Sequence, residues 1–405
     1  MLERSRMDDR YRISLEKLRE HLGGGLGEIH LIERDDLTQV QLFDTFYTDF
    51  EKVLRQIHAE NPDSELLLNL SSGTPAMKSA LNVISVLSPF PMRAIQVSTP
   101  NQRENPKDES PMDYDVEAYW ECNQDNEPGF PNRCLEVQSE HLLVKIKKES
   151  IQRLLNAYDY QAALLLAQEI SDFIAPEAMK MLEAAACRAQ LDQQGFDKAL
   201  QGLNVSWIPV KTSGPRQVFE YVLSLRIKMA QGTYADFIRG LTPAAVDLFS
   251  MCLKNELSIE VGDFCERNRK GVWMISDTRM PSSKRGPEIM KALLSQSQYG
   301  EIKYGPLGSL HVLYIVQGLS KNFELIKQMK EIRNVEESVR NTAAHEIVSV
   351  TDDWIYKKVG MHAQDICRLL EKLVIAAGIH IQSRDWDSYD TMNHDIIRAL
   401  LLPRA

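Results

Sequence analysis

The sequence of 405 residues lacks several features that define common protein classes. Its 6 cysteines, at positions 122, 134, 187, 252, 265 and 367, show no C-x-x-C spacing, so neither a disulfide framework nor a zinc site is indicated. No apolar run approaches the ~20 residues needed to span a bilayer, and the first ten residues lack the apolar core of a signal peptide. We therefore expect a cytoplasmic protein that binds no metal and no membrane.

Positive charge and nucleotide-binding signatures are also scarce. The chain has 47 Lys and Arg against 57 Asp and Glu, a net charge of −10, which disfavours a protein that coats nucleic acid through many phosphate contacts. A catalytic cleft needs only a few such contacts, so a nuclease is not excluded. No Walker Lys-Ser/Thr pair directly follows Gly73 and no G-x-G-x-x-G motif precedes it, so ATP hydrolysis and dinucleotide binding are poorly supported.

Residues 1 to about 125 alternate between helical and strand patterns. This succession predicts a mostly parallel, doubly wound α/β sheet with right-handed crossovers. It begins with a helix, whereas such domains usually open on a central strand. The predicted helices cover approximately residues 11–22, 40–57 and 76–86, and the predicted strands cover 28–32, 66–70 and 93–98.

The composition changes after this α/β region. From Asn101 to Pro131 the chain is polar, acidic and rich in proline, which indicates a linker. Helical periodicity then continues to the C-terminus, and no internal repeat of 20–50 residues is present. The sequence thus predicts an α/β region followed by an all-α region.

Residues 69–75, Asn-Leu-Ser-Ser-Gly-Thr-Pro, connect a predicted strand to a predicted helix. Gly73 allows a tight turn, Thr74 suits the N-cap and Pro75 suits the first helical position, so free amides and the helix dipole would favour a phosphate. Ser71 and Ser72 add hydroxyl donors, and Asn69 can contact a base or a ribose. Taken alone, these residues fit a capped turn that binds nothing equally well.

A second candidate site lies near the end of a predicted amphipathic helix, where Arg340 and Asn341 precede His345. A guanidinium is always charged and holds two phosphate oxygens, while imidazole titrates near neutral pH and can pass a proton. Five residues on one helix amount to about 500°, so Arg340 and His345 point roughly 140° apart. Two copies of the helix around a two-fold axis would bring both pairs into one cleft.

The neighbouring residues of this helix support that interpretation. A helical apolar stripe that could pack a dimer core includes Leu325, Met329, Ile332, Val339, Ala343 and Ile347. Asn341 stands one turn before His345 and can orient it. The alternative is an accidental Arg upstream of one of 9 histidines.

Together, the two motifs resemble the CRISPR-associated ancillary ribonucleases of type III-A systems (the Csm6 family), which join an N-terminal CARF sensor domain to a C-terminal HEPN nuclease domain. Residues 69–75 look like that family's N-L-S-S-G-T-P loop, and residues 94–100 look like the strand that follows it. Residues 159–163 are similar to a segment of its linker helices. Arg340 and His345 match the HEPN R-x4–6-H pattern.

The resemblance implies a Rossmann-like α/β CARF domain at 1–125, an all-α linker at 126–235 and an all-α HEPN domain at 236–405. It also implies a homodimer that binds cyclic oligoadenylate, with cyclic hexa-adenylate favoured over tetra-adenylate, and that then cleaves single-stranded RNA. No cofactor and no stable association with the CRISPR effector are expected. The implied ligand-binding residues are Asn69, Ser71, Ser72, Gly73, Thr74, Gln96 and Ser98, and the implied catalytic residues are Arg340, Asn341 and His345.

The sequence departs from this family at its start. Family members open with a strand that ends in a Gly-Thr-Asp-Pro-like loop, and here Met1 falls beyond that strand, so we expect either an internal start or a truncated copy. Two other functions stay open: a catalytically inactive sensor that signals to a partner, and a ring nuclease that degrades its own activator. The presence of both Arg340 and His345 speaks against the inactive sensor.

Overall fold

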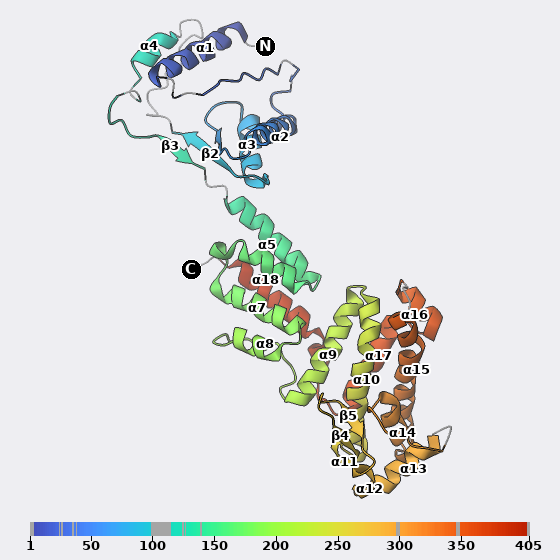
Figure 1. Cartoon of the computed structure of the whole chain (residues 1–405). Coiled ribbons are helices and arrows are strands. Elements are labelled where there is room, and N and C mark those ends of the chain that lie inside the picture. Colours follow the sequence, from blue (N-terminus) through green and yellow to red (C-terminus); the bar gives the residue numbers. More distant parts are fainter. Residues whose placement is uncertain are drawn as a thin grey trace. The chain divides into compact units, whose positions relative to one another are not determined.

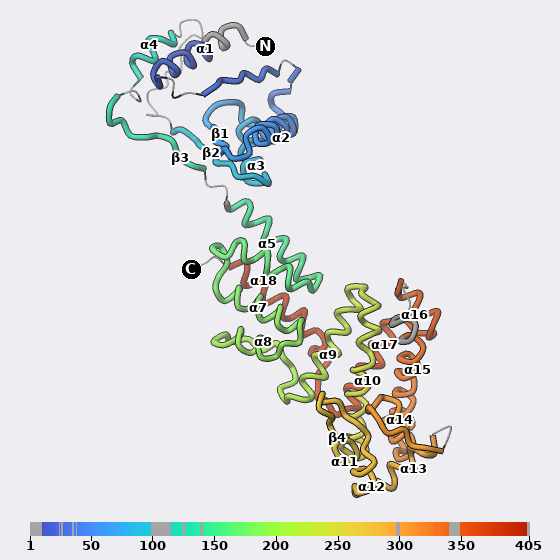
Figure 2. The backbone as a smooth tube through the Cα atoms, viewed as in Figure 1, coloured from blue at the N-terminus to red at the C-terminus, as the bar shows by residue number. Residues whose placement is uncertain are grey.

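The structure is a computed structural model in which the chain divides into two compact units, Met1–Ile146 and Lys147–Ala405 (Figures 1 and 2). It describes residues 4–23, 25, 27–34, 36–37, 39–98, 115–123, 125, 127–137, 140–296, 300–345 and 349–402. Of these, the backbone alone is described for 4–9, 140 and 340–345. The two units are considered separately below.

The first unit contains a small mixed sheet and its covering helices. Its elements are α1 (Arg4–His21), α2 (Phe43–Glu60), β1 (Leu66–Asn69), α3 (Pro75–Leu87), β2 (Met92–Val97), α4 (Val116–Glu121) and β3 (Cys134–Glu136). Strands β1 and β2 are parallel, with Leu66 opposite Met92, and α3 is the crossover between them. This part of the predicted α/β succession is confirmed.

The core of the first unit lies between the sheet and two helices. Leu54 of α2, Leu68 of β1 and Ile84 of α3 form a buried apolar cluster, and Tyr47 and Phe50 pack against it. The apolar face of α2 recurs at helical spacing, which is why one side of this helix is buried while Glu51 and Arg55 on the other side form an ion pair. The cluster fixes the two strands that carry the first candidate site.

Two features of this sheet differ from the sequence-based prediction. The strand predicted at residues 28–32 is not formed: the segment is exposed, and none of the described residues pairs with it. A strand needs a neighbour for its backbone groups, and apolar composition alone does not supply one. In addition, β3, in the region predicted as an all-α linker, pairs antiparallel to β2, with Glu136 opposite Ile95. The sheet therefore has one parallel and one antiparallel pairing.

The second unit is mostly helical. After α5 (Glu140–Asn156), which begins in the first unit, it comprises α6 (Tyr160–Gln168), η2 (Ser171–Phe173), α7 (Pro176–Ala189), α8 (Gln193–Ala199), α9 (Ser213–Ala230), α10 (Tyr234–Leu257), α11 (Val261–Phe264), β4 (Cys265–Arg267), β5 (Trp273–Ile275), α12 (Arg279–Ser282), α13 (Gly286–Gln296), α14 (Ser309–Leu319), α15 (Phe323–His345), α16 (Asp352–Val359), α17 (Ala363–Ala376), η3 (Ser383–Asp387) and α18 (Ser388–Leu401).

Helix α10 is the central element of the second unit. It contacts α9, α14, α15 and α17, and ten of its residues, including Leu241, Leu248 and Phe249, are buried (Figure 1). A helix that is apolar on most of its faces is stable only when other helices surround it. Among the described residues, no helix is both long and apolar enough to cross a membrane.

Helix α18 lies beside α7, although they are far apart in the sequence (Figure 2). The hydroxyl of Tyr158 donates a hydrogen bond to Asp390 at 2.7 Å, and the side-chain amide of Asn393 donates to the carbonyl of Leu155 at 2.8 Å. These long-range contacts join the end of α5 and the residues just after it to α18, the last helix of the described chain.

One short sheet interrupts the helices. Strands β4 and β5 pair antiparallel, with Cys265 opposite Ile275. The turn between them is stabilised by Asn268, whose side-chain oxygen accepts the amides of Lys270 and Val272. The prediction of an all-α C-terminal region thus misses this pair, because three-residue strands carry too few residues to show a periodicity of two.

Candidate functional site

The loop between β1 and α3 forms the first candidate site. Gly73 has a φ of +100°, a conformation that glycine adopts at little cost, and it turns the chain from the strand into the helix. Thr74 is the N-cap of α3, since its hydroxyl accepts the amide of Met77 at 3.3 Å, and Pro75 follows in the first turn. The free amides of this helix end suit an anion.

Three of the polar side chains predicted for this site are engaged inside the protein. The side-chain oxygen of Asn69 accepts the amide of Ser71 at 2.9 Å, and the Ser71 hydroxyl accepts the amide of Val97 at 2.7 Å. The Thr74 hydroxyl also donates to the carbonyl of Val40 at 3.1 Å. These three side chains therefore shape the loop and tie it to β2 and to the segment before α2.

Other groups of the loop stay open. Ser72 and Gly73 are exposed, and within the described part of the chain neither the Ser72 hydroxyl nor the Ser72 and Gly73 amides have a hydrogen-bond partner. Gln96 is exposed on β2, while Ser98 just beyond it donates from its amide to the carbonyl of Arg133 at 3.0 Å. Because β1 and β2 are parallel, their carboxyl ends meet at one edge, and these groups lie near that edge.

The second candidate site belongs to α15. The helix ends at His345, so Arg340, Asn341 and His345 occupy its last two turns, as the sequence predicted. The side chains of residues 340–345 lie outside the described part of the structure, as do those of Ala343 and Ile347 in the predicted apolar stripe. The contacts of α15 before residue 340 are described, and they show how this helix is held.

The apolar stripe of α15 packs inside the chain. Leu325, Met329, Ile332 and Val339 are at most 3% exposed, and α15 contacts α10, α14 and α17 of the same chain. Side chains that are already buried cannot also form the core of a dimer, so the interpretation of these four residues as a dimer seam is wrong. The stripe instead fixes the orientation of the helix that carries Arg340 and His345.

A buried charged group that the sequence analysis missed anchors the middle of α15. Glu336 is 3% exposed, accepts a hydrogen bond from the hydroxyl of Ser309 on α14 at 2.5 Å, and pairs with Arg333 at 3.0 Å. It lies one turn before position 340. A glutamate amid charged neighbours on an amphipathic helix usually faces water, so the sequence alone carries no signal of its burial.

A carboxylate at the start of α16 binds the first residues of α17. Asp352 accepts the amide of Ala363 at 2.7 Å and lies 2.8 Å from Nδ1 of His362. The Ala363 amide, followed by His362, holds the pKa of this carboxyl below its ordinary value. The ring of His362 stacks on Tyr356 at a centroid distance of 4.5 Å. These contacts join α16 to the start of α17.

Comparison with known proteins accounts for most of the chain. Family models match in order: the Csm6 CARF domain at residues 28–134, the CRISPR-associated protein Csm6 6H domain at 137–189 and the Csm6 HEPN domain at 207–397. The CRISPR system endoribonuclease Csm6 of Mycobacterium tuberculosis is 30% identical over 371 residues, which cover 89% of this chain and 81% of that protein. The chain belongs to the Csm6 family. The resemblance inferred from its motifs is confirmed.

Other members of the Csm6 family are similar over the same extent. The CRISPR system endoribonuclease Csm6′ of Streptococcus thermophilus is 22% identical over 365 residues, which cover 89% of this chain and 81% of that protein. The solved structure of Enterococcus italicus Csm6 bound to cyclic hexa-2′-fluoro-hexa-dAMP matches with a TM-score of 0.64 at 19% identity, over 90% of this chain and 81% of that chain. At this identity the structural match supports the shared fold.

The two candidate sites fall in different parts of the Csm6 arrangement. The loop at 69–75 lies within the CARF match, and α15 lies within the HEPN match. A CARF domain therefore precedes a HEPN domain in one chain, as the motif order predicted. The 6H match covers α5, α6 and α7, the helices between them.

Proposed function

We propose that this chain is a metal-independent endoribonuclease that cleaves single-stranded RNA in type III CRISPR antiviral defence when cyclic oligoadenylate binds its CARF domain. The observation that carries the proposal is the order of CARF, 6H and HEPN matches in one chain that holds the R-x4-H motif inside the HEPN match. Two relatives, the Csm6 proteins of Mycobacterium tuberculosis and Streptococcus thermophilus described above, are named endoribonucleases, which agrees with that motif.

The activator is proposed to bind at the edge where β1 and β2 end. The exposed Ser72 and Gly73 and the N-terminus of α3 offer amides and a hydroxyl to a ligand phosphate. Gln96 offers an amide side chain to a base or ribose, while Asn69, Ser71, Thr74 and Ser98 support the loop and the strand end. Cyclic hexa-adenylate is favoured over tetra-adenylate, because the structurally similar Enterococcus italicus protein holds a hexameric ring analogue.

Cleavage is proposed to use the ribose 2′-hydroxyl as nucleophile. The 2′-oxygen attacks the adjacent phosphorus as the bond to the 5′-oxygen breaks, which leaves a 2′,3′-cyclic phosphate and a 5′-hydroxyl. His345 exchanges a proton with the 2′-hydroxyl or with the leaving 5′-oxygen, and Arg340 stabilises the negative charge on the phosphate. Asn341 positions one of these groups. The chemistry needs no metal, because a guanidinium and an imidazole supply the charge and the proton transfer.

The active enzyme is proposed to be a homodimer in which both copies of α15 contribute to one cleft. On an ideal helix, positions five residues apart are separated by about 500°, that is, roughly 140° around the axis, so a two-fold axis is the simplest way to bring Arg340 and His345 to one phosphate. Because the apolar stripe of α15 is buried within the chain, the dimer contact must use other residues of the HEPN domain.

The test of this function is the activity of two alanine variants. Arg340→Ala and His345→Ala should each lower the rate of RNA cleavage by about 10²–10⁴, as is typical when a proton-transfer group or a charge-stabilising donor is removed. Arg368→Ala is the matched control, because Arg368 is an exposed arginine of α17 in the same unit. Activator binding and dimer mass should stay unchanged in all three proteins. Cleavage by His345→Ala at the parental rate, with activator bound, would refute the assignment.

A further inference from the structure

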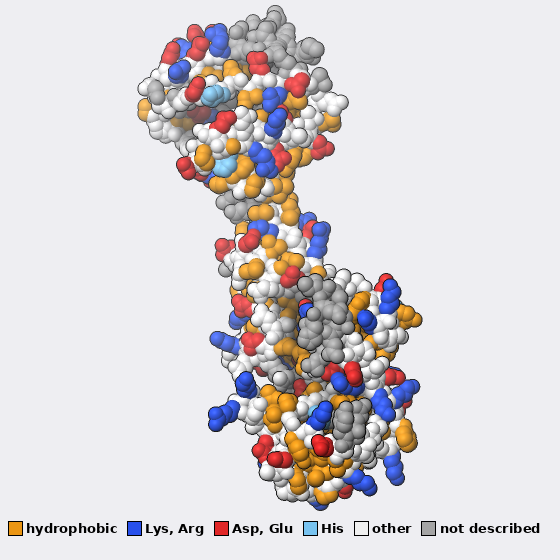
Figure 3. All heavy atoms as spheres, turned by 45° about the vertical axis from the view of Figure 1, so that its right-hand side comes forward, with side chains coloured by type: hydrophobic (Ala, Val, Ile, Leu, Met, Phe, Trp, Pro, Cys, Tyr) orange, Lys and Arg blue, Asp and Glu red, His pale blue; other side chains and the backbone are white. Residues whose placement is uncertain are grey.

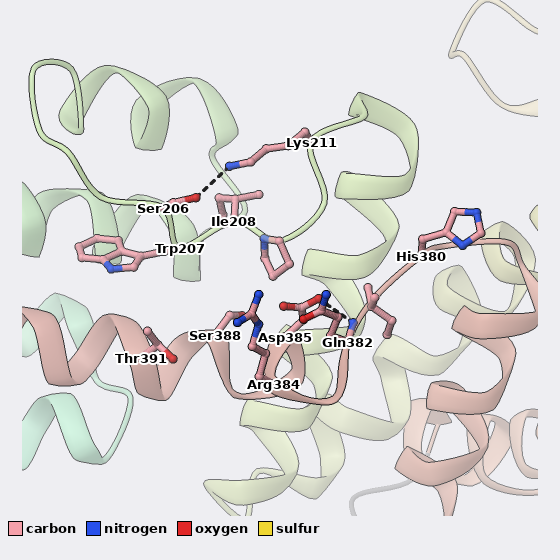
Figure 4. A pocket seen from close by; sticks show the side chains of 12 residues that line it. Ser206, Trp207, Ile208, Lys211, His380, Gln382, Arg384, Asp385, Ser388 and Thr391 are labelled. Carbon is pink, nitrogen blue, oxygen red and sulfur yellow. Dashed lines mark hydrogen bonds between the residues drawn. The ribbon is translucent and has the colours of Figure 1, made fainter.

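The second unit has a polar cavity whose lining includes no residue of either candidate site. It has a volume of about 620 Å³, within the range typical of ligand sites. One wall is the segment from Ser206 to Lys211 before α9, and the other is the segment from His380 through η3 to Thr391 on α18 (Figure 4). The two ends of the HEPN match therefore meet at this cavity.

Two cations face the cavity from its opposite walls. Lys211 extends over one side, where its Nζ lies 3.3 Å from the hydroxyl of Ser206, and Arg384 rises from η3 on the other (Figure 4). Both side chains are exposed. Within the described residues, Arg384 has no acidic partner, whereas Arg216, Arg226 and Arg285 of the same unit each pair with a carboxylate.

Among the described residues, Asp385 is the one carboxylate that lines the cavity, and it has a structural role. Asp385 accepts the amide of Gln382 at 2.7 Å and so caps η3. The hydroxyls on the α18 side are also used: Ser388 accepts a hydrogen bond from Arg188 at 2.8 Å, and Thr391 donates to the carbonyl of Asp387 at 3.2 Å. The groups left to meet a ligand include the charged donors of Lys211 and Arg384 and the exposed side-chain amide of Gln382, with His380 exposed at the rim.

This set of donors favours phosphate groups over bases. A guanidinium holds two phosphate oxygens and an ammonium acts as a point charge, so both cations suit backbone phosphates. Trp207 cannot serve as a stacking platform, because it is 3% exposed and its indole nitrogen donates to Asp395 at 2.9 Å. Trp207 therefore offers no surface in this cavity on which a base could stack.

The charge of the whole protein surface does not favour RNA binding. In Figure 3 both basic and acidic side chains occur across the face shown, and the whole chain carries a net charge of −10. Bulk electrostatic attraction to RNA is thus weak, and the affinity for a strand has to come from a few positions where cations lack acidic partners.

We propose that Lys211 and Arg384 bind backbone phosphates of the single-stranded RNA substrate at a subsite separate from the R-x4-H motif. The inference rests on the proposed ribonuclease function, because it takes single-stranded RNA as the substrate. The subsite holds the strand without regard to base sequence and lowers the substrate concentration needed for cleavage, while the chemical step at Arg340 and His345 is unaffected.

Binding is tested without cleavage. A fluorescent 20-nucleotide single-stranded RNA is titrated into the His345→Ala protein, alone and combined with Lys211→Gln and Arg384→Gln, at several salt concentrations. Each lost phosphate contact should lower the slope of log affinity against log salt by about 0.7, so the double change should lower it by about 1.4. The matched control is Lys180→Gln with Lys327→Gln, which removes two exposed positive charges from α7 and α15 that do not line the cavity.

Kinetics separate this subsite from the catalytic motif. In the protein with intact His345, the Lys211→Gln, Arg384→Gln double variant should raise KM for the 20-nucleotide RNA and leave kcat unchanged. The proposal is overturned if the salt slope and KM of the double variant equal those of the Lys180→Gln, Lys327→Gln control. It is also overturned if a titration with inorganic phosphate shows that the double variant has lost phosphate binding while its affinity for the RNA is unchanged. Because the slope reports binding and not cleavage, failure of the subsite and failure of the nuclease assignment are distinguishable.

Discussion

Arg188 and Glu220 form a buried, two-pronged ion pair between α7 and α9. Nε of Arg188 lies 2.8 Å from one carboxylate oxygen of Glu220 and Nη2 lies 3.0 Å from the other, and the side chains are only 2% and 4% exposed. The remaining donors of the guanidinium reach the carbonyl and hydroxyl of Ser388, and the ring of Tyr389 lies 3.9 Å from it. One side chain thus joins three helices.

This pair predicts a large loss of stability when either partner is removed. Arg188→Ala leaves the Glu220 carboxylate buried without its counter-charge, which typically costs about 3–5 kcal/mol of unfolding free energy. Glu220→Gln leaves the Arg188 guanidinium buried without its counter-charge and should lower the unfolding free energy by a similar amount. Chemical denaturation followed by circular dichroism measures the transition of the helical unit.

The control for this measurement is again Arg368→Ala. Arg368 pairs with Asp365 three residues away, with side chains 64% and 44% exposed, and such surface pairs contribute about 0–1 kcal/mol. If Arg188→Ala shifts the unfolding transition no more than Arg368→Ala does, the buried pair does not hold α7 and α9 to α18.

The activator site predicts a sharp effect of a side chain at position 73. Gly73→Val should reduce the affinity for cyclic hexa-adenylate at least about ten-fold, the equivalent of one lost hydrogen bond to a charged group. The reason is that the φ of +100° disfavours a β-branched residue and a new Cβ would come within 3.3 Å of the Met77 sulfur. Calorimetric titration of the full chain measures the affinity.

Gly129→Val provides a matched control for that titration. Gly129 lies in the same unit with a φ of +87° and has no described atom within 4 Å of a new Cβ, so it carries comparable backbone strain away from the loop. Equal affinities of the Gly73→Val and Gly129→Val proteins would remove the loop from the activator site. A Ser72→Ala change, which breaks no bond among the described residues, should weaken binding by a few-fold.

The proposed reaction predicts which RNA atoms are essential. Cleavage should continue in EDTA, yield a 2′,3′-cyclic phosphate by mass spectrometry, and stop when the ribose upstream of the scissile phosphate is 2′-deoxy. A 2′-deoxy ribose on the downstream side should have little effect, because its 2′-position takes no part in the displacement. Loss of activity in EDTA, restored by Mg²⁺, would instead indicate a metal-dependent mechanism.

Asp352 predicts a pH-dependent contribution to stability. Its pKa is lowered in the folded chain, chiefly by the Ala363 amide and then by His362, so the contribution is present above the unfolded pKa and is lost as pH falls through the folded one. The melting-temperature difference between the wild type and Asp352→Asn should therefore be full above about pH 5 and shrink below about pH 4.

The control for this pH series is Asp353→Asn. Asp353 stands in the same first turn of α16 and is exposed, so its removal changes the charge near the helix N-terminus by the same amount. A difference between the wild type and Asp352→Asn that stays constant from pH 7 to pH 3 would show that the carboxylate is not held by these partners.

Local pattern predicted the elements that carry the candidate sites. The β1–α3–β2 crossover follows from apolar runs separated by helical spacing, and the Thr74 N-cap with Pro75 after it follows from capping preferences. The order of the two motifs predicted the family. The predicted catalytic trio of Arg340, Asn341 and His345 stays a prediction, because the side chains of these residues lie outside the described part of the chain.

The features that the sequence did not predict depend on distant neighbours. Strand β3 exists because β2 offers it an edge, and its three residues are all exposed, so no periodicity marks it. The same applies to the apolar stripe of α15: Met329 and Ile332 fit a dimer seam and an internal core equally well, and only the packing of α10 and α17 decides between them. Likewise, nothing local marks Arg188 as buried.

The contacts of α18 with α7 have a consequence for how the protein is made. Arg188 and Ser388 are 200 residues apart, so during translation the connecting helices wait for this partner while the intervening residues are added. At about 5–20 residues per second, that interval lasts roughly 10–40 seconds. For this time the face of α7 that α18 covers stays open on the ribosome-bound chain, and a chaperone that binds exposed helical surfaces has access to it.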